Sequence, residues 1–61
     1  MTTGRNMSIK RYYVYCKSRF NPQYGVRRVV VTAPTKQWIK DNWYSIAGTT
    51  EYFIKGIERI A

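Results

Sequence analysis

Residues 9–19 read IKRYYVYCKSR, and the alternation of side chains in this stretch decides how we interpret the rest of the chain. In a strand, successive side chains point to opposite faces. The even positions from 12 to 16 are apolar: Tyr12, Val14 and Cys16. The odd positions combine cations with rings: Arg11, Tyr13, Tyr15, Lys17 and Arg19. We therefore expect a strand with one face buried in a core and the other face open to solvent.

A turn follows this strand. Residues 19–25, RFNPQYG, contain an Asn-Pro turn signal and a glycine, Gly25, that suits a backbone position with positive φ. A second strand begins directly afterwards, so we expect a hairpin with a long tip. We also expect the rings of Phe20 and Tyr24 at this tip to fold back onto the sheet.

Residues 26–33, VRRVVVTA, form the strand that the sequence predicts most clearly, because Val and Thr are β-branched and fit a pleated sheet. The row that we place inward consists of Val29, Val31 and Ala33. The row that we place outward consists of Arg28, Val30 and Thr32. The outward row then lies on the same side of the sheet as the cations and rings of the first strand.

A single helix is predicted after Pro34. Thr35 is a good N-cap and Gly48 is a natural C-terminal cap, so the intervening KQWIKDNWYSIA fits one helix. Its apolar residues recur at helical spacing and form one face: Ile39, Trp43, Ile46 and Ala47. Lys36 and Lys40 lie one turn apart and form a short basic ridge that, together with the helix N-terminus, can hold a phosphate.

The last segment, residues 49–60, fits two structures. Its Thr, Tyr, Phe and Ile residues favour a strand, whereas Ile54, Ile57 and Ile60 also fit one face of a helix. Gly56 disfavours a helix and in a strand indicates a bulge. We expect a strand, because a hairpin with one helix is poorly stabilised and a third strand completes a sheet.

The predicted fold class is therefore α+β, with a three-stranded antiparallel-type sheet and one helix packed on one face, in the order ββαβ. The alternative is a β-hairpin followed by two helices, ββαα. We expect residues 1–8 to form a disordered N-terminal arm and residues 9–61 to form a single small domain.

The charges are distributed unevenly along the chain. Its 61 residues include 11 Lys and Arg but only 3 Asp and Glu, for a net charge of +8. Residues 1–40 contain no acid, since Asp41, Glu51 and Glu58 all follow them. A positive electrostatic field of this kind attracts polyanions.

The side chains present argue against catalysis. The chain has no histidine and a single cysteine, Cys16, and its acids are scattered. General acid–base catalysis and an activated thiol both need a positioned partner, and zinc sites need several Cys or His ligands. We expect a protein that is not an enzyme, with no catalytic residue, no cofactor and no metal, and with Cys16 as a small buried hydrophobe.

The sequence contains neither a secretory signal nor an apolar run near the roughly 18 residues that suggest a membrane span. We therefore expect a cytoplasmic protein without a membrane partner.

The odd row of the first strand predicts a nucleic-acid-binding protein, because tyrosines on a sheet can stack with bases while cations neutralise phosphates. Single strands are slightly favoured over duplexes, and both DNA and RNA fit. The candidate nucleic-acid-binding residues come from both strands, the turn and the helix: Arg11, Tyr13, Tyr15, Lys17, Arg19, Arg28, Lys36 and Lys40.

Other interpretations stay open. The same face suits a small inhibitor or adaptor, of the kind that viral and mobile-element genomes encode, that docks on an acidic surface of a larger protein. An assembly role through edge strands is a further alternative, and the chain is expected to be a monomer or a homodimer. Finally, Tyr13 and Tyr15 can stack on Phe53 or cross-strand neighbours instead of on bases. A one-residue error in assigning the faces of the strand would also bury both rings.

Overall fold

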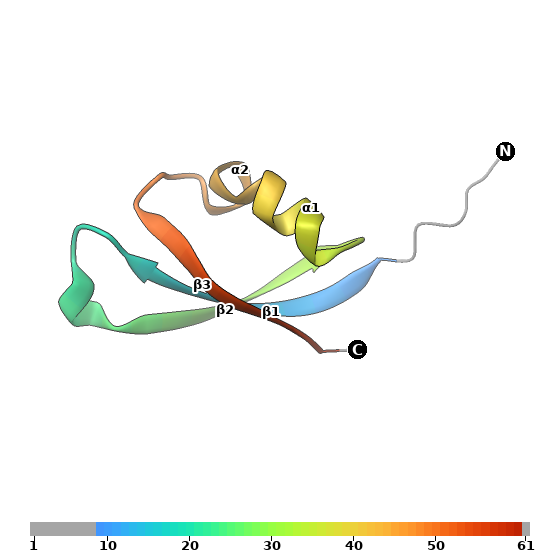
Figure 1. The fold of residues 1–61 in the computed structure, drawn as a ribbon, viewed down its shortest axis with the longest axis horizontal. Coiled ribbons are helices and arrows are strands. Elements are labelled where there is room, and N and C mark those ends of the chain that lie inside the picture. The colour runs from blue at the N-terminus through green and yellow to red at the C-terminus, as the bar shows by residue number, and fades with distance from the viewer. Residues whose placement is uncertain (1–8, 61) are drawn as a thin grey trace, which may run out of the picture.

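A computed structural model of the chain describes residues 9–60, and Figure 1 shows its fold. The elements in chain order are β1 (Lys10–Ser18), a 3-10 turn (Pro22–Tyr24), β2 (Val26–Ala33), α1 (Lys36–Asp41), α2 (Trp43–Ala47) and β3 (Tyr52–Arg59). The expected N-terminal arm, residues 1–8, lies outside the described residues, as does residue 61.

The three strands form one antiparallel sheet in the order β2-β1-β3, so β1 is the central strand. The two helices lie over one face of this sheet, and the other face is uncovered by any helix (Figure 1). The small α+β architecture with a three-stranded antiparallel sheet agrees with the sequence prediction. The alternative of a hairpin followed by two helices does not describe this chain, because its second helix would occupy β3.

Two short helices replace the single helix that the sequence predicted, and Asn42 separates them. The Asn42 backbone N–H and its side-chain amide both donate to the Trp38 carbonyl, at 3.1 and 2.9 Å. A side chain that bonds nearby backbone competes with regular helical hydrogen bonding, which explains the break. The predicted caps are confirmed. Thr35 Oγ1 accepts a hydrogen bond from the Trp38 N–H at 3.0 Å, and Gly48 adopts a left-handed conformation with φ of 73°.

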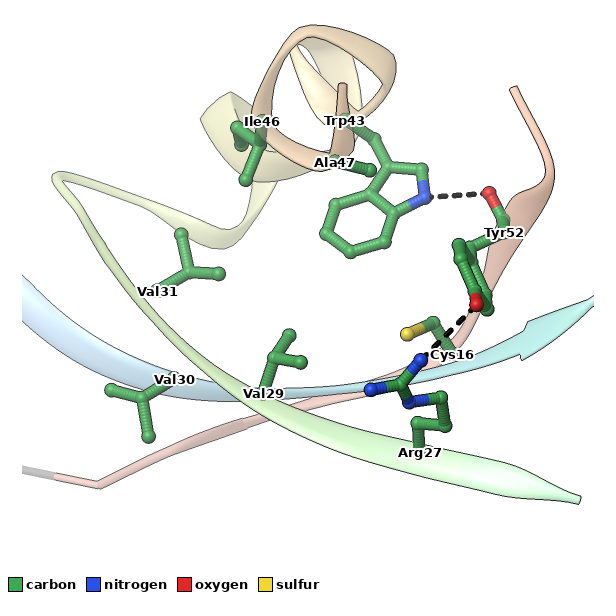
Figure 2. Close-up of a pocket in the computed structure, with 9 residues that line it drawn as sticks. All are labelled: Cys16, Arg27, Val29, Val30, Val31, Trp43, Ile46, Ala47 and Tyr52. Atoms are coloured by element: carbon green, nitrogen blue, oxygen red, sulfur yellow. Dashed lines mark hydrogen bonds between the residues drawn. The ribbon is translucent and has the colours of Figure 1, made fainter. Parts of the chain in front are cut away.

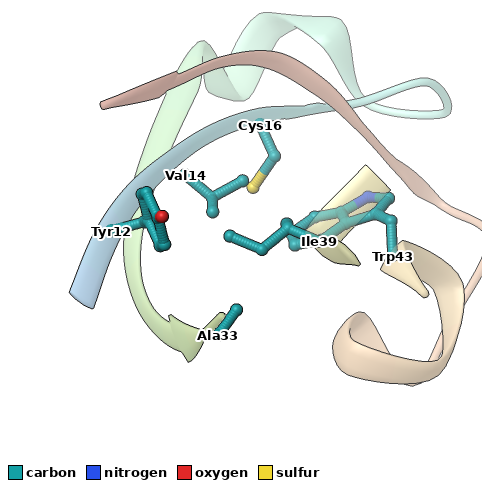
Figure 3. Packing of buried hydrophobic residues seen from close by; sticks show 6 residues of the cluster. All are labelled: Tyr12, Val14, Cys16, Ala33, Ile39 and Trp43. Carbon is teal, nitrogen blue, oxygen red and sulfur yellow. The ribbon is translucent and has the colours of Figure 1, made fainter. Parts of the chain in front are cut away.

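The core lies between the helices and the covered face of the sheet (Figure 3). It is built from the even row of β1, the end of β2 and the apolar helix face: Tyr12, Val14, Cys16, Ala33, Ile39 and Trp43. The indole N–H of Trp43 donates to the Tyr52 carbonyl at 2.9 Å and so attaches α2 to β3. The inward rows predicted for both strands are confirmed, and the one-residue error that would bury Tyr13 and Tyr15 does not occur.

The strand β3 contains the bulge that Gly56 indicated. Tyr15 pairs with Gly56 and the next residue, Cys16, pairs with Ile54, so Lys55 has no partner on β1. A bulge of this kind bends a strand and re-aims its side chains. Lys55 therefore lies at the outer edge of the sheet as an unpaired residue.

The tip of the β1–β2 hairpin differs from the prediction. Phe20 and Tyr24 are 68% and 65% exposed, so neither ring folds back onto the sheet. The tip projects past the end of the helix layer (Figure 1). Its base is fixed by the buried Ser18, whose hydroxyl donates to the Glu51 carboxylate at 2.6 Å and accepts the Phe20 N–H at 3.2 Å.

Candidate nucleic-acid interface

The face of the sheet opposite the helices carries the odd row of β1, and we call this surface the open face. Its β1 residues are Arg11, Tyr13, Tyr15 and Lys17, and its neighbours on the flanking strands are Arg28, Val30, Phe53, Gly56 and Glu58. The register places Tyr13 between Val30 and Glu58, and Tyr15 between Arg28 and Gly56. Five of the predicted residues therefore share one surface.

Tyr13 is engaged by a cation from the neighbouring strand. The Arg28 guanidinium carbon lies 4.3 Å from the centroid of the Tyr13 ring. This distance is well within the range of a favourable cation–π contact. Arg28 therefore covers one side of the Tyr13 ring.

Tyr15 is engaged by an acid from the other neighbouring strand. Its hydroxyl donates a hydrogen bond to Glu58 Oε1 at 2.8 Å. This bond raises the pKa of Tyr15 above its ordinary value, because the phenol must stay protonated to donate; desolvation and the negative charge of Glu58 act in the same direction, and Arg28 opposes them. Both tyrosines therefore contact cross-strand neighbours, which agrees in part with the alternative that these rings pack within the sheet. Glu58 also places a carboxylate on the open face.

The carboxylates of the described residues accept hydrogen bonds from neutral donors. Asp41 accepts from the Gln37 amide at 2.9 Å, and Glu58 accepts from Tyr15. Glu51 accepts from Ser18 at 2.6 Å and from Asn21 at 3.3 Å. None of these bonds within residues 9–60 comes from Lys or Arg. Among residues 9–60, the positive charges of Lys and Arg are therefore not offset by a hydrogen-bonded carboxylate.

Arg19 leaves the odd row at the end of β1. Its guanidinium donates to the Tyr44 hydroxyl at 3.0 Å and lies 5.8 Å from the centroid of the Phe53 ring. Tyr44 belongs to α2, on the covered side of the sheet, whereas Phe53 pairs with Lys17 of the open face. Arg19 is therefore held at the corner where the helix layer and β3 meet.

Lys36 and Lys40 lie on α1, on the side of the sheet away from the open face. The structure brings them together with Lys55 around a cavity of about 460 Å³ at the outer edge of β3. We call this cavity the lysine groove, and its lining residues are Lys36, Lys40, Ile54, Lys55, Gly56 and Ile57. The predicted binding residues are thus divided between the open face, the Arg19 corner and this groove.

A second, more apolar pocket of about 290 Å³ lies between α2 and β2 (Figure 2). Its apolar walls include Val29, Val31, Trp43 and Ile46. On one side, Arg27 donates to the Tyr52 hydroxyl at 3.1 Å, with its guanidinium 5.6 Å from the ring centroid.

The Cys16 thiol also borders this apolar pocket. Burial raises the pKa of the thiol, with the charge of Arg27 acting in the opposite direction. The thiol therefore stays protonated near neutral pH, which does not favour a nucleophile.

Sequence reasoning missed three residues that matter here: Phe53, Lys55 and Glu58. All three lie on β3, whose register against β1 depends on the bulge. The alternation of β3 alone cannot place them, because the bulge interrupts the period of two. The one available signal was Gly56, which predicted a bulge. It did not predict that Lys55, the residue before it, would be exposed.

The described part of the chain offers no cluster of three or more His, Cys, Asp or Glu side chains that could hold a metal ion. No helix among residues 9–60 is long and apolar enough to cross a membrane.

In comparisons with known proteins, no family model, no curated protein sequence and no solved structure matches this chain. What the chain binds is therefore inferred from its own residues.

Proposed function

We propose that this protein binds nucleic acid through the open face of its sheet, and that it binds single strands more tightly than duplexes. The observation that carries this proposal is the row of cations and rings on the central strand, on the face without helices: Arg11, Tyr13, Tyr15 and Lys17. Tyrosine rings on a sheet stack with bases, and the flanking cations neutralise phosphates.

Tyr15 is the best-placed stacking ring. Its neighbour on β3 is Gly56, which has no side chain to cover it. A Cβ added at Gly56 would lie 4.0 Å from Tyr15 Cδ2, in ordinary van der Waals contact, so the glycine leaves this part of the ring uncovered. The hydrogen bond to Glu58 holds the hydroxyl end of the ring and so fixes its orientation. An oriented ring loses little conformational entropy when a base stacks on it.

Arg28 contributes a second stacking surface. Because its guanidinium already lies over Tyr13, a base that approaches this position meets the guanidinium plane. Arginine stacks on π-systems through this plane and at the same time supplies a positive charge. Tyr13 therefore acts mainly as support for Arg28.

Single strands suit this surface better than duplexes because stacking requires bases that are not already paired. Base edges in a duplex are read by elements that enter a groove. The open face instead presents rings and a guanidinium across a sheet, which fits bases splayed away from a partner strand.

The proposal is tested by titrating the protein into labelled single-stranded and duplex oligonucleotides of one sequence at two salt concentrations. Fluorescence anisotropy reports the binding. We expect tighter binding to the single strand and weaker binding at higher salt, because each phosphate contact releases counterions. Tyr13→Ala and Tyr15→Ala should weaken single-strand binding more than duplex binding. Absence of binding at low salt would eliminate the proposal, and equal losses on both ligands would indicate phosphate attraction without stacking.

The β2 edge favours a second candidate, a protein-binding adaptor or inhibitor. This edge strand pairs with β1 in an uninterrupted register, and its Val26 and Val30 are 54% and 57% exposed. The apolar pocket of Figure 2 lies beside it. A regular edge strand can accept a strand from a partner, and the net charge of +8, with Arg27 and Arg28 exposed on this strand, favours an acidic partner.

Val30→Lys distinguishes the two candidates, since it charges the edge strand and adds a cation to the open face. Nucleic-acid affinity should stay equal or rise in this variant, whereas strand addition at β2 should be lost. Fluorescence anisotropy measures the nucleic-acid affinity. Co-purification of partner proteins from a nuclease-treated lysate measures strand addition. A partner protein that co-purifies with the wild type and is lost from this variant would favour the adaptor, whereas unchanged co-purification would contradict strand addition at β2.

A further inference from the structure

The lysine groove is a charged cavity separate from the open face. α1 supplies Lys36 and Lys40, and β3 supplies Lys55. The remaining lining residues, Ile54, Gly56 and Ile57, are uncharged, so the groove contains three ammonium groups and no carboxylate. All three lysine side chains are exposed at its rim.

The fold brings these charges together by two independent features. Lys36 and Lys40 are one turn apart on α1, a spacing at which like charges destabilise a helix. The bulge in β3 leaves Lys55 unpaired at the sheet edge facing the same cavity. The acid adjacent to Lys40 in sequence, Asp41, bonds to Gln37 and is not among the lining residues. Repulsion among the lysines is thus left for a bound anion to relieve.

We propose that the lysine groove is a phosphate-binding site. Lysine is a compact point charge with three rotatable donors, which suits a phosphate group approached from several directions. An extended acidic peptide is a poorer fit, because it would have to add to the β3 edge. A bulge and an edge lysine are the features by which proteins prevent strand addition.

A continuous set of cations connects the groove with the open face. Lys17 pairs with Phe53 across β1 and β3. The guanidinium of Arg19 and the ammonium of Lys55 each lie 5.8 Å from the centroid of the Phe53 ring. A strand that leaves the open face at Lys17 therefore meets cations around the β3 edge as far as the groove. This path for the nucleic-acid backbone rests on the proposed function, whereas the phosphate site itself does not.

The phosphate site is tested by titrating the isotope-labelled protein with inorganic pyrophosphate and following backbone amide shifts. We expect saturable shifts at residues 54–57 and along α1. Each single Lys→Gln substitution should weaken binding about two- to fivefold, the range of exposed ion pairs. The triple variant Lys36→Gln, Lys40→Gln, Lys55→Gln should abolish the shifts. Arg27→Gln, which removes one positive charge on the β2 side of the sheet as each single lysine variant does at the groove, should leave them unchanged.

Shifts that are absent in the wild type, or that persist in the triple variant, would overturn the proposal. If the triple variant does not fold, the three single variants decide it, since equal binding by all of them and the wild type overturns it as well. Tighter binding of an oligoglutamate peptide than of pyrophosphate to the groove would also overturn the proposal, because the groove would then prefer a protein ligand.

The source of the phosphate is decided with oligothymidylates of about four and about twelve nucleotides, which fall within the site sizes of single-strand-binding folds. If the groove holds the nucleic-acid backbone, the triple variant binds the longer oligonucleotide more weakly and the shorter one equally. If both affinities are unchanged while pyrophosphate binding is lost, the groove takes a free phosphate compound. If no oligonucleotide binds the wild type, the proposed function fails, and the pyrophosphate titration still decides the groove.

Discussion

The guanidinium of Arg28 lies 4.3 Å from the centroid of the Tyr13 ring, and this contact joins β2 to β1 on the face of the sheet that the helices leave uncovered. A base that reaches this position stacks on a planar cation supported by a ring. The contact therefore belongs both to the stability of the hairpin and to the proposed binding surface, and substitutions at Arg28 separate the two roles.

Arg28→Lys should weaken single-strand binding while leaving its salt dependence unchanged, because the charge stays and the stacking plane is lost. The free energy of unfolding should fall by about 0.5 kcal/mol, the lower end of exposed cation–π contacts. Anisotropy titrations at several salt concentrations and urea unfolding measure the two effects. A flatter salt dependence with unchanged affinity at low salt would contradict the stacking role.

Glu58→Gln should strengthen binding of single strands. The Glu58 carboxylate accepts the Tyr15 hydroxyl and carries the negative charge of the open face. Its removal should increase affinity about two- to fivefold, as for an exposed charge interaction. Glu51→Gln is not a suitable control because Glu51 fixes the hairpin base. Asp41→Asn on α1 is suitable, and an equal gain in that variant would show that only net charge matters.

The stability of the fold should depend on the ionisation of Tyr15. Its pKa is raised in the folded protein, so the folded state holds this proton more tightly than the unfolded chain does. The resulting stabilisation is present below the unfolded pKa of about 10 and is lost as the pH rises through the higher folded value. Thermal unfolding across this range should show a steeper loss for the wild type than for Tyr15→Phe. Identical profiles would contradict the Glu58 bond.

Ile39→Val should destabilise the protein without affecting binding. Ile39 is fully buried between α1 and the sheet, and loss of one methylene in such a core costs about 0.5–1.5 kcal/mol. Val30→Ala, which also removes apolar atoms but at an exposed position, should change the free energy of unfolding by less than about 0.5 kcal/mol. Urea denaturation distinguishes the two, and equal losses would mean that the core is placed wrongly.

The sequence favoured the correct assignment of the two faces of β1, because the apolar Tyr12, Val14 and Cys16 alternate with positions that carry cations and rings. The caps at Thr35 and Gly48 were predictable for a similar reason, since each residue type satisfies a particular backbone requirement. These features depend on residues close together in the chain.

The remaining features depend on contacts between distant residues. Glu58 meets Tyr15 across 43 positions, and only the register of β3 brings them together. The bulge sets that register and leaves Lys55 unpaired among the residues that line the lysine groove, which the pattern of β3 alone does not reveal. Arg19 fits the odd row by its spacing, yet its hydrogen bond to Tyr44 holds it at the corner of the fold.

The most direct test of the proposed function compares two tyrosines that lie on opposite sides of the sheet. Tyr15 lies on the open face, whereas Tyr44 is half exposed on α2. At low salt, Tyr15→Ala should weaken binding of a single-stranded oligothymidylate about 5- to 150-fold, which corresponds to about 1–3 kcal/mol for one stacked base. Tyr44→Ala releases Arg19 from the Tyr44 hydroxyl and should therefore weaken binding only slightly. Equal effects of the two substitutions, or no effect of Tyr15→Ala, would contradict binding through the open face.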